Sequence, residues 1–189
     1  MYYIENETFA RLNFEQLPEK VTEFEDCFFE DCDFQGATLN GLVFIRCTFS
    51  RSNFSLADFS GSQLQEVRFN DCKLSGARFE HANPFNLSFS FYRCNLSHSL
   101  FTGLKIPGTG FNECNLAEVD FTECNLSGAS FTNSDLRGAA YLHTNLTAAD
   151  FTQAQNLEID PETNRLQKAR FSLQGLPGLL TRHGLQIEP

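Results

Sequence analysis

Large apolar residues recur at every fifth position over most of this chain. Twelve successive positions spaced by five residues, from Phe24 to Phe79, are all Phe or Leu. A second series of twelve, from Leu96 to Phe151, holds only large apolar residues. This period matches neither the roughly 3.6 residues per turn of an α-helix nor the period of about two of a β-strand. It therefore predicts a chain that turns once in every five residues.

The two series differ in register by two residues, and the slip falls within residues 81–93. Upstream, Phe9 and Phe14 keep the first register, but the next step lands on Glu19. A charged side chain is costly to bury without a partner, so we expect a loop over residues 16–20. The pattern predicts a repeat domain over residues 1–156 and a separate C-terminal segment over residues 157–189.

A small or medium residue lies two positions before most of the periodic apolar residues, and glycine clusters two positions after them. All seven cysteines occupy the first of these positions: Cys27, Cys32, Cys47, Cys72, Cys94, Cys114 and Cys124. A free cysteine behaves there as a small apolar residue, and the spacings of five and ten residues are not those of zinc fingers. The glycines supply turn conformations that other residues adopt less easily.

A corner after every five residues closes a coil after four sides. One coil then takes about twenty residues, and neighbouring coils can hydrogen-bond at the ordinary spacing of strands, about 4.8 Å. Side chains at equivalent positions stack in columns, so the core consists of ladders of Phe and Leu. The stability of such a solenoid comes from contacts between adjacent coils.

These residues resemble the pentapeptide-repeat family, whose motif is A(D/N)LXX. The closest matches are Ala-Asp-Phe-Ser at 57–60, Cys-Asn-Leu-Ser-Gly at 124–128 and Ser-Asp-Leu-Arg-Gly at 134–138. The resemblance covers about residues 20–155. It implies an all-β fold, a right-handed quadrilateral β-helix, and the handedness comes from the resemblance alone.

The repeat stops at Leu157, and the tail that follows has signals of a helical cap. Asp160 and Pro161 are typical of a helix start, Ala169–Ser172 is expected to form a last wall, and a second short helix is expected from Pro177 to Gly184. The tail resembles that of the Qnr and microcin-immunity members of the family. That resemblance implies a homodimer joined end to end through apolar tail residues: Phe171, Leu176, Leu179, Leu180, Leu185 and Ile187. The alternative is a cap on its own chain.

The formal net charge of −10 argues against direct binding of nucleic acid, because acidic residues outnumber basic ones by 24 to 14. The first residues lack the basic and apolar regions of a signal peptide, and no apolar run approaches the roughly 18 residues that cross a bilayer. We therefore expect a cytoplasmic protein without a membrane partner.

The acidic residues fall in bands along the sequence. Residues 12–33 hold eight acids and one base, and residues 109–160 also hold eight acids and one base. Residues 34–108, in contrast, hold four acids and seven bases. The second acidic band provides the predicted partner-binding residues: Glu113, Glu118, Asp120, Glu123, Asp135 and Asp150.

The resemblance to Qnr-type members implies a DNA mimic that binds DNA gyrase or topoisomerase IV in place of DNA and protects it from quinolones or toxins. The alternative is a solenoid scaffold or adaptor for another protein. No nucleophile, base or metal constellation is recognisable, and the four histidines form no local pair. We therefore predict a non-enzymatic binding protein without a cofactor or metal.

Overall fold

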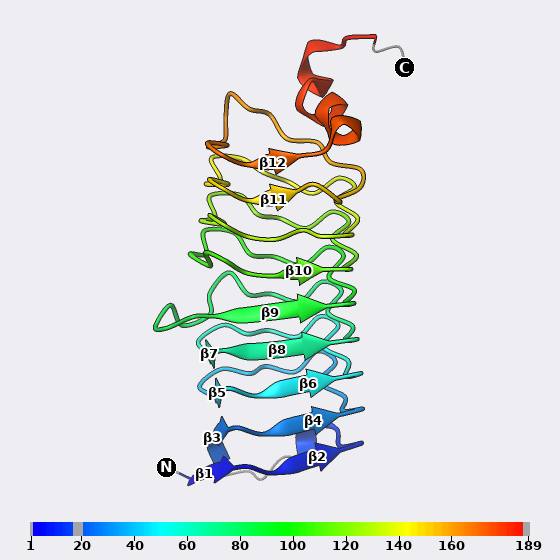
Figure 1. The fold of residues 1–189 in the computed structure, drawn as a ribbon. Helices are drawn as coiled ribbons and strands as arrows, with labels where there is room; N and C mark the ends of the chain where they lie inside the picture. Colours follow the sequence, from blue (N-terminus) through cyan, green and yellow to red (C-terminus); the bar gives the residue numbers. More distant parts are fainter. Residues whose placement is uncertain (1, 17–20, 187–189) are drawn as a thin grey trace.

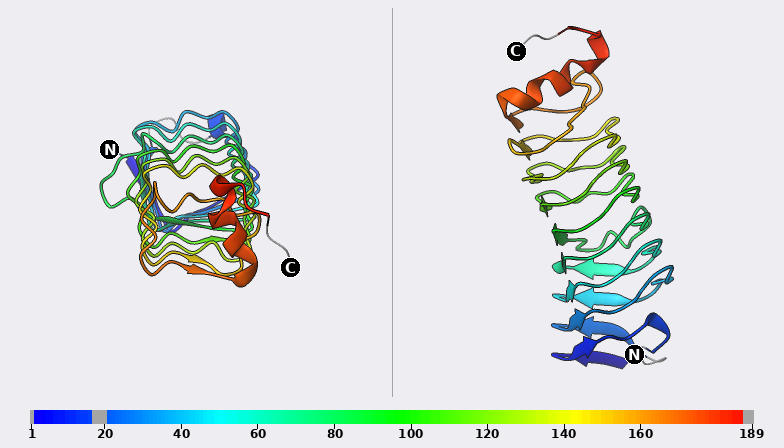
Figure 2. Two further views of the ribbon diagram at one scale, coloured as in Figure 1. Left: turned by 90° about the horizontal axis from the view of Figure 1, so that it is seen from above. Right: turned by 90° about the vertical axis from the view of Figure 1, so that its right-hand side faces the viewer.

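The chain winds into a right-handed parallel β-helix with four walls in each coil. The computed structural model describes residues 2–16 and 21–186. The coils stack along one axis from the N-terminal to the C-terminal end (Figure 1), and the outline along that axis is quadrilateral (Figure 2). The fold predicted from the five-residue period is confirmed, and so is the handedness that the family resemblance implied.

Each coil takes twenty residues over most of the chain. Phe24 pairs with Phe44, and Phe44 pairs in turn with Leu64. The backbone of each coil donates to and accepts from its neighbours, as in the bond from the Phe34 amide to the Asn53 carbonyl (2.7 Å). The polar groups of the walls are therefore satisfied between coils rather than within one.

We number the four walls in chain order. The first wall carries a four-stranded sheet of β1 (Tyr2–Glu5), β3 (Val21–Glu25), β5 (Val43–Ile45) and β7 (Gln63–Gln65). The second wall carries a six-stranded sheet of β2 (Thr8–Ala10), β4 (Phe28–Glu30), β6 (Thr48–Ser50), β8 (Val67–Asn70), β9 (Phe89–Tyr92) and β10 (Phe111–Asn112). Farther along the second wall, β11 (Asp150–Phe151) pairs with β12 (Arg170–Phe171).

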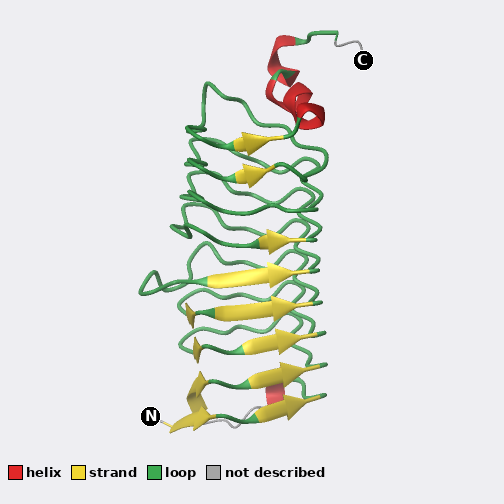
Figure 3. Cartoon of the chain, viewed as in Figure 1, coloured by secondary structure: helices red, strands yellow, loops and turns green. Residues whose placement is uncertain are grey.

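The third and fourth walls have too little regular pairing to form long strands. Isolated parallel bridges join their coils, such as Asn95 with Asn115 on the third wall and Leu100 with Asp120 on the fourth. Most of the chain is accordingly drawn as loop in Figure 3, although every wall follows the same stacking.

Apolar side chains fill the inside of the coil as predicted. The residues of both five-residue series are buried throughout, from Phe24 to Phe151. The second wall contributes one unbroken column of phenylalanines: Phe9, Phe29, Phe49, Phe69, Phe91, Phe111, Phe131, Phe151 and Phe171. Neighbouring rings in this column are stacked, with centroids 4.6–5.4 Å apart.

The predicted register slip is confirmed and lies between β8 and β9. Val67 pairs with Phe89, twenty-two residues later, instead of twenty. The two extra residues belong to a loop, residues 83–88, that projects from the stack immediately before β9 (Figure 1). The slip therefore changes the outline of one coil while the phenylalanine column continues from Phe69 to Phe91.

The tail begins with a turn, so the helix predicted from Pro161 is wrong. An oxygen of Asp160 accepts a hydrogen bond from the Glu162 amide (2.9 Å), and residues 161–163 form a turn. Arg165 already pairs with Asn145, as one more rung of the first wall. Residues 161–164 form a turn and a bend that lead into this rung, and not a helix.

Two 3₁₀ helices, η2 (Leu173–Leu179) and η3 (Thr181–His183), then cover part of the C-terminal end (Figure 3). The Ser172 hydroxyl caps the N-terminus of η2. Pro177 therefore lies inside this helix, and the prediction that a helix begins at Pro177 is wrong. Gly184 ends η3 in the left-handed conformation (φ 59°), as predicted. The last wall expected over Ala169–Ser172 is present as β12.

The loop expected over residues 16–20 is only partly described. Gln16 belongs to a 3₁₀ turn, η1 (Phe14–Gln16), and its side chain accepts a hydrogen bond from the Asn13 amide (2.9 Å). The remainder, residues 17–20, lies outside the described residues.

We expect Phe49→Ala to lower the free energy of unfolding by about 3–5 kcal/mol, because it removes a fully buried ring from the phenylalanine column and leaves a cavity. Phe28→Ala is the matched control, since Phe28 points outward from the same wall and is 52% exposed. Urea unfolding of both variants measures the difference. A loss below 1 kcal/mol for Phe49→Ala would show that the column does not carry the stability of the fold.

Candidate partner-binding surface

Three of the six predicted acidic residues surround the fourth wall. Asp120 lies on this wall, where its backbone forms parallel β-bridges with Leu100 of the preceding coil and Ala140 of the following coil. Glu118 occupies the corner by which the chain enters the wall, and Glu123 occupies the corner by which it leaves, both with left-handed backbone (φ 58° and 60°). Glu118 and Glu123 are exposed, so one coil presents three carboxylates around a single wall. We call Glu118, Asp120 and Glu123 the fourth-wall acids.

The other three predicted acids lie elsewhere on the coil. Glu113 is at the corner between the second and third walls, Asp135 is on the third wall, and Asp150 is on the second wall. Two of them are paired with bases: Asp135 with Arg137 (3.5 Å) and Asp150 with Arg170 (3.1 Å). Within one chain, the acidic band is therefore a girdle around the rod and not one continuous face.

Hydrogen bonds hold the Asp120 carboxylate in place. It accepts from the Thr122 amide (2.8 Å) and from the Thr102 hydroxyl (3.1 Å). Burial alone would raise the pKa of Asp120, but the hydrogen bonds from Thr122 and Thr102 outweigh burial and hold the pKa below its ordinary value. The fourth wall therefore carries a fixed negative charge at neutral pH.

Histidines lie beside the two corner acids of the fourth wall. Nδ1 of His98 is 3.3 Å from a Glu118 oxygen. His143 follows Glu123 by one coil at the other corner, where the Glu123 amide donates to the Leu142 carbonyl (2.8 Å). When His98 is protonated, it partly neutralises the charge of Glu118.

Elsewhere, arginines are paired with acids of the preceding coil. The guanidinium of Arg51 donates to both oxygens of Asp31 (2.8 and 3.1 Å), and Arg93 donates to both oxygens of Asp71 (2.7 and 2.8 Å). Both pairs lie on one edge of the rod, the corner between the second and third walls. With Arg11 and Glu113, positive and negative residues alternate along that edge.

Counting charge along the chain does not reveal this pairing, because the partners lie in different coils. In the sequence, an arginine and an acid that pair in this way are separated by twenty residues, or by twenty-two residues across the register slip. At the corner between the first and second walls, Arg46 likewise contacts Asp26 (2.7 Å) and Glu25 (2.6 Å). Three arginines of the mildly basic residues 34–108, Arg46, Arg51 and Arg93, therefore neutralise acids of an adjacent coil.

The seven cysteines are free and buried, as their inward position predicted. Burial raises the pKa of Cys47 and of Cys124 to about 12, so these thiols stay protonated at neutral pH. Several thiols donate to backbone carbonyls, as Cys94 does to Phe69 (3.3 Å). Among the described residues, no group of three or more His, Cys, Asp or Glu side chains is arranged to hold a metal.

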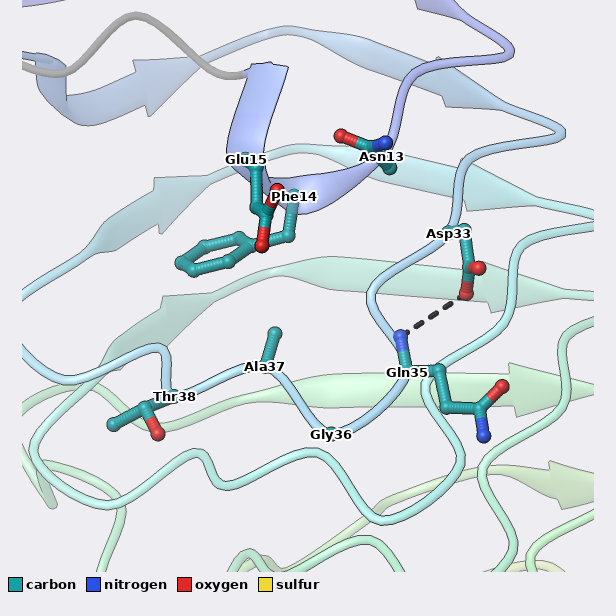
Figure 4. A pocket seen from close by; sticks show the side chains of 8 residues that line it. All are labelled: Asn13, Phe14, Glu15, Asp33, Gln35, Gly36, Ala37 and Thr38. Carbon is teal, nitrogen blue, oxygen red and sulfur yellow. Dashed lines mark hydrogen bonds between the residues drawn. The ribbon is translucent and has the colours of Figure 1, made fainter.

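A hollow of about 470 Å³ lies near the N-terminal end, between the first two coils (Figure 4). Its charged residues are Glu15 and Asp33, and Asp33 accepts hydrogen bonds from the Gln35 amide (3.1 Å) and the Asn53 side chain (3.1 Å). These hydrogen bonds occupy the Asp33 carboxylate, which therefore holds the local backbone and the next coil in place. The hollow brings no nucleophile and base together among its described lining residues.

The predicted dimer residues separate into two groups. Phe171 stacks on Phe151 (5.3 Å) and ends the core column, and Leu179 packs against the core. Leu176, Leu180 and Leu185 are exposed by 41%, 37% and 59%, while Ile187 lies outside the described residues. Leu173, which is not among the predicted dimer residues, is 82% exposed.

The tail is attached to its own coil at two points. The Ile159 amide donates to the Gly178 carbonyl (3.0 Å), and a β-carbon at Gly178 would overlap the Leu157 carbonyl, so only glycine allows this approach. Arg182 contacts Asp160 (2.7 Å) and Glu162 (2.8 Å). The tail therefore caps its own coil and still leaves several leucines exposed to solvent.

The repeat and its coil agree with comparisons to known proteins. The family model described as pentapeptide repeat region matches residues 22–90 and 85–151. The chain belongs to the pentapeptide-repeat family, whose solenoids are generally structural or binding proteins. A search of curated proteins finds no match. None of the described helices is long and apolar enough to span a membrane.

Solved structures with a similar coil have low sequence identity. A trypsin-treated form of QnrB1, a plasmid-mediated fluoroquinolone resistance protein, is 22% identical, with a TM-score of 0.47 over 96% of this chain and 99% of its own. HetL, which is involved in heterocyst differentiation in the cyanobacterium Nostoc sp. strain PCC 7120, is 18% identical, with a TM-score of 0.30 over 92% and 85%. A protein from the Arabidopsis thaliana thylakoid lumen is 25% identical, with a TM-score of 0.22 over 64% and 68%.

We expect the corner ion pairs to make stability depend on acid pH. Hydrogen bonds from Arg51 and Arg93 lower the pKa of Asp31 and of Asp71 below 3.8. Groups with a lowered pKa in the folded state stabilise above the unfolded pKa, and this stabilisation disappears as the pH falls through the folded value. The free energy of unfolding should therefore fall as the pH drops below about 4.

The double variant Asp31→Asn with Asp71→Asn should show a shallower fall over the same range. Urea unfolding at pH 7, 4 and 3 measures it, with the exposed Glu158→Gln as the control. Equal slopes for the double variant and the parent would contradict a role of these pairs in stability.

Proposed function

We propose that the chain is a non-enzymatic binding protein that presents the fourth-wall acids to a basic surface of a partner protein. The observation that carries this proposal is the arrangement of Glu118, Asp120 and Glu123 around one wall of a rigid coil. Fixed carboxylates on a stiff surface attract a basic partner and accelerate association. The stacked coils hold the backbone that carries them in place.

The partner we propose is the DNA-binding surface of DNA gyrase or topoisomerase IV, which the chain would occupy in place of DNA. The support is the sequence resemblance to Qnr-type and microcin-immunity proteins, together with the acidic wall.

A second candidate function is an adaptor for another protein. The observation that favours it is the neutralised edge of the rod, where Arg51 and Arg93 pair with acids and leave little net charge. Exposed aromatic side chains lie elsewhere on the coil, among them Phe28 (52%) and Phe85 (62%). Aromatic residues are enriched in protein interfaces, so these positions suit a partner that is not basic.

We also propose a homodimer formed through the C-terminal ends. The exposed leucines of the tail, Leu173, Leu176, Leu180 and Leu185, support it, because apolar patches on a surface favour association. In such a dimer, the acidic segments 109–160 of the two chains would flank the dimer centre.

The variant Glu118→Lys, Asp120→Lys, Glu123→Lys tests the binding proposal. We expect the association rate with gyrase to fall by about tenfold or more at low salt, because charge complementarity acts mainly on association. Surface plasmon resonance at several salt concentrations measures it, and a supercoiling assay with and without a quinolone reports protection. Glu118 and Glu123 are exposed, and exposed charges contribute little to stability. The change at Asp120 also removes its hydrogen bonds with Thr122 and Thr102, so circular dichroism must first show that the variant is folded.

The control carries the same change of net charge on other parts of the rod. Glu5→Lys, Glu30→Lys, Glu66→Lys alters exposed carboxylates of the first wall, the second wall and the corner between them. It should bind as the parent does. If the fourth-wall variant also binds as the parent, or if the parent does not bind gyrase, DNA mimicry is wrong and the adaptor remains.

Leu180→Glu with Leu185→Glu tests the dimer separately. A charge desolvated at an apolar contact is costly, so this variant should be a folded monomer where the parent is a dimer. Sedimentation velocity at micromolar concentration distinguishes the two. A parent protein that sediments as a monomer would rule out the dimer.

A further inference from the structure

The register slip interrupts the first wall and opens a hollow in it. The first-wall sheet ends at β7, and bridges on this wall resume only at Lys105, which pairs with Asn125. Between them, where one more strand would lie, the chain forms the projecting loop 83–88 (Figure 1). The two ends of the loop still hydrogen-bond to the preceding coil, from the Asn83 amide to the Ser62 carbonyl (2.8 Å) and from the Ser88 amide to the Leu64 carbonyl (2.9 Å), but the regular strand pairing of this wall is interrupted.

The hollow has a volume of about 340 Å³ and is mostly apolar. It lies beside the corner between the fourth and first walls, and its lining residues are Glu80, Ala82, Pro84, Leu87, Gly103, Leu104 and Lys105. Ala82 and Leu104 are buried, and Leu87 packs against the core. A narrow apolar surface with one acid suits a long side chain that ends in a positive charge.

Glu80 supplies a carboxylate oxygen that is not satisfied. Its side chain is only 12% exposed. Oε1 accepts a hydrogen bond from Nε of Arg78 (3.1 Å), but Oε2 is buried and, within the described parts of the chain, has no hydrogen-bond partner. A buried carboxylate oxygen without a partner is costly, and such groups in native proteins call for an explanation.

The nearest bases do not satisfy this oxygen. Arg78 also faces Asp58, at 3.6 Å, so its charge is shared. Lys105 lines the hollow, but no ion pair joins it to Glu80 in residues 2–16 and 21–186. The remaining requirement is a donor that enters the hollow from outside.

We propose that this hollow is a binding site for a lysine or arginine side chain of a partner protein. The methylene stem lies along Pro84, Leu87 and Leu104, and the charged end donates to the Glu80 carboxylate, which turns from its buried position toward the hollow to meet it. Phe85, in the same loop and 62% exposed, offers an apolar contact to the residues that flank the inserted side chain. The site contains none of the fourth-wall acids, although it lies on the same corner as Glu123, one coil earlier, where the Gly103 amide donates to the Thr122 carbonyl (2.9 Å). Its test needs no topoisomerase.

Nuclear magnetic resonance of the full ¹⁵N-labelled chain tests this proposal. The probes are Nα-acetyl-lysine methylamide and its norleucine analogue, which has the stem without the charge. We expect saturable shifts of the Glu80, Leu87 and Gly103 amides with the lysine probe only, and a dissociation constant on the order of 1–10 mM, as suits a fragment with one charged hydrogen bond.

Two variants locate the charge. Glu80→Gln should weaken binding of the lysine probe by about tenfold, because it removes the charged acceptor. Lys105→Met should strengthen it by about two- to threefold, because it removes a like charge at the rim. Glu30→Gln, on a different wall, is the matched control and should bind as the parent does.

The alternative is that Oε2 of Glu80 binds only an ordered water. In that case the lysine probe produces no saturable shift, or the norleucine analogue produces the same shifts. Either result overturns the proposal, as does equal binding by Glu80→Gln and the parent. A weaker affinity for the lysine probe after Lys105→Met would also overturn it, since removal of a like charge at the rim should strengthen the binding of a cation.

Discussion

The structure depends on contact between successive coils, and the column of stacked phenylalanines shows this most clearly. No single coil has an interior, because each ring is covered by the ring of the coil before it and the coil after it. The ring centroid of Phe111, for example, lies 5.3 Å from that of Phe91 and 5.4 Å from that of Phe131. The backbone has the same requirement, since its hydrogen bonds also run between coils. Stability is therefore a sum of contacts between neighbours along one axis.

That dependence explains how the fold accommodates the register slip. Two extra residues within the stack would misalign every later ring, which is a large cost. The chain instead places them in the loop 83–88, and the rings of Phe69 and Phe91 still stack at 5.2 Å. The cost is confined to the first wall, which loses one strand and leaves the Glu80 carboxylate beside an open hollow. The slip thus preserves the core and creates a local site.

The sequence was sufficient to predict the features that repeat. The five-residue period predicted the buried columns, the coil of twenty residues, the inward thiols and the slip. It did not predict the tail, because a short 3₁₀ helix depends on local caps such as Ser172 and on close approaches such as that of Gly178 to Leu157. The corners were predicted only in part. Among the described residues, twenty that are not glycine have positive φ, most of them at corners and Glu118 and Glu123 among them, so stacking overrides the usual preference for glycine.

The candidate site was harder to predict because charge acts across coils and not along the chain. Residues 34–108 are mildly basic when counted in sequence, yet Arg46, Arg51 and Arg93 of this band are paired with acids one coil away. The same geometry distributes the acids of residues 109–160 over several walls. What distinguishes the fourth wall is that the five-residue step places Glu118 and Glu123 on its two corners and Asp120 between them. A partner that recognises this protein by charge therefore meets one wall of one coil, and not an acidic rod.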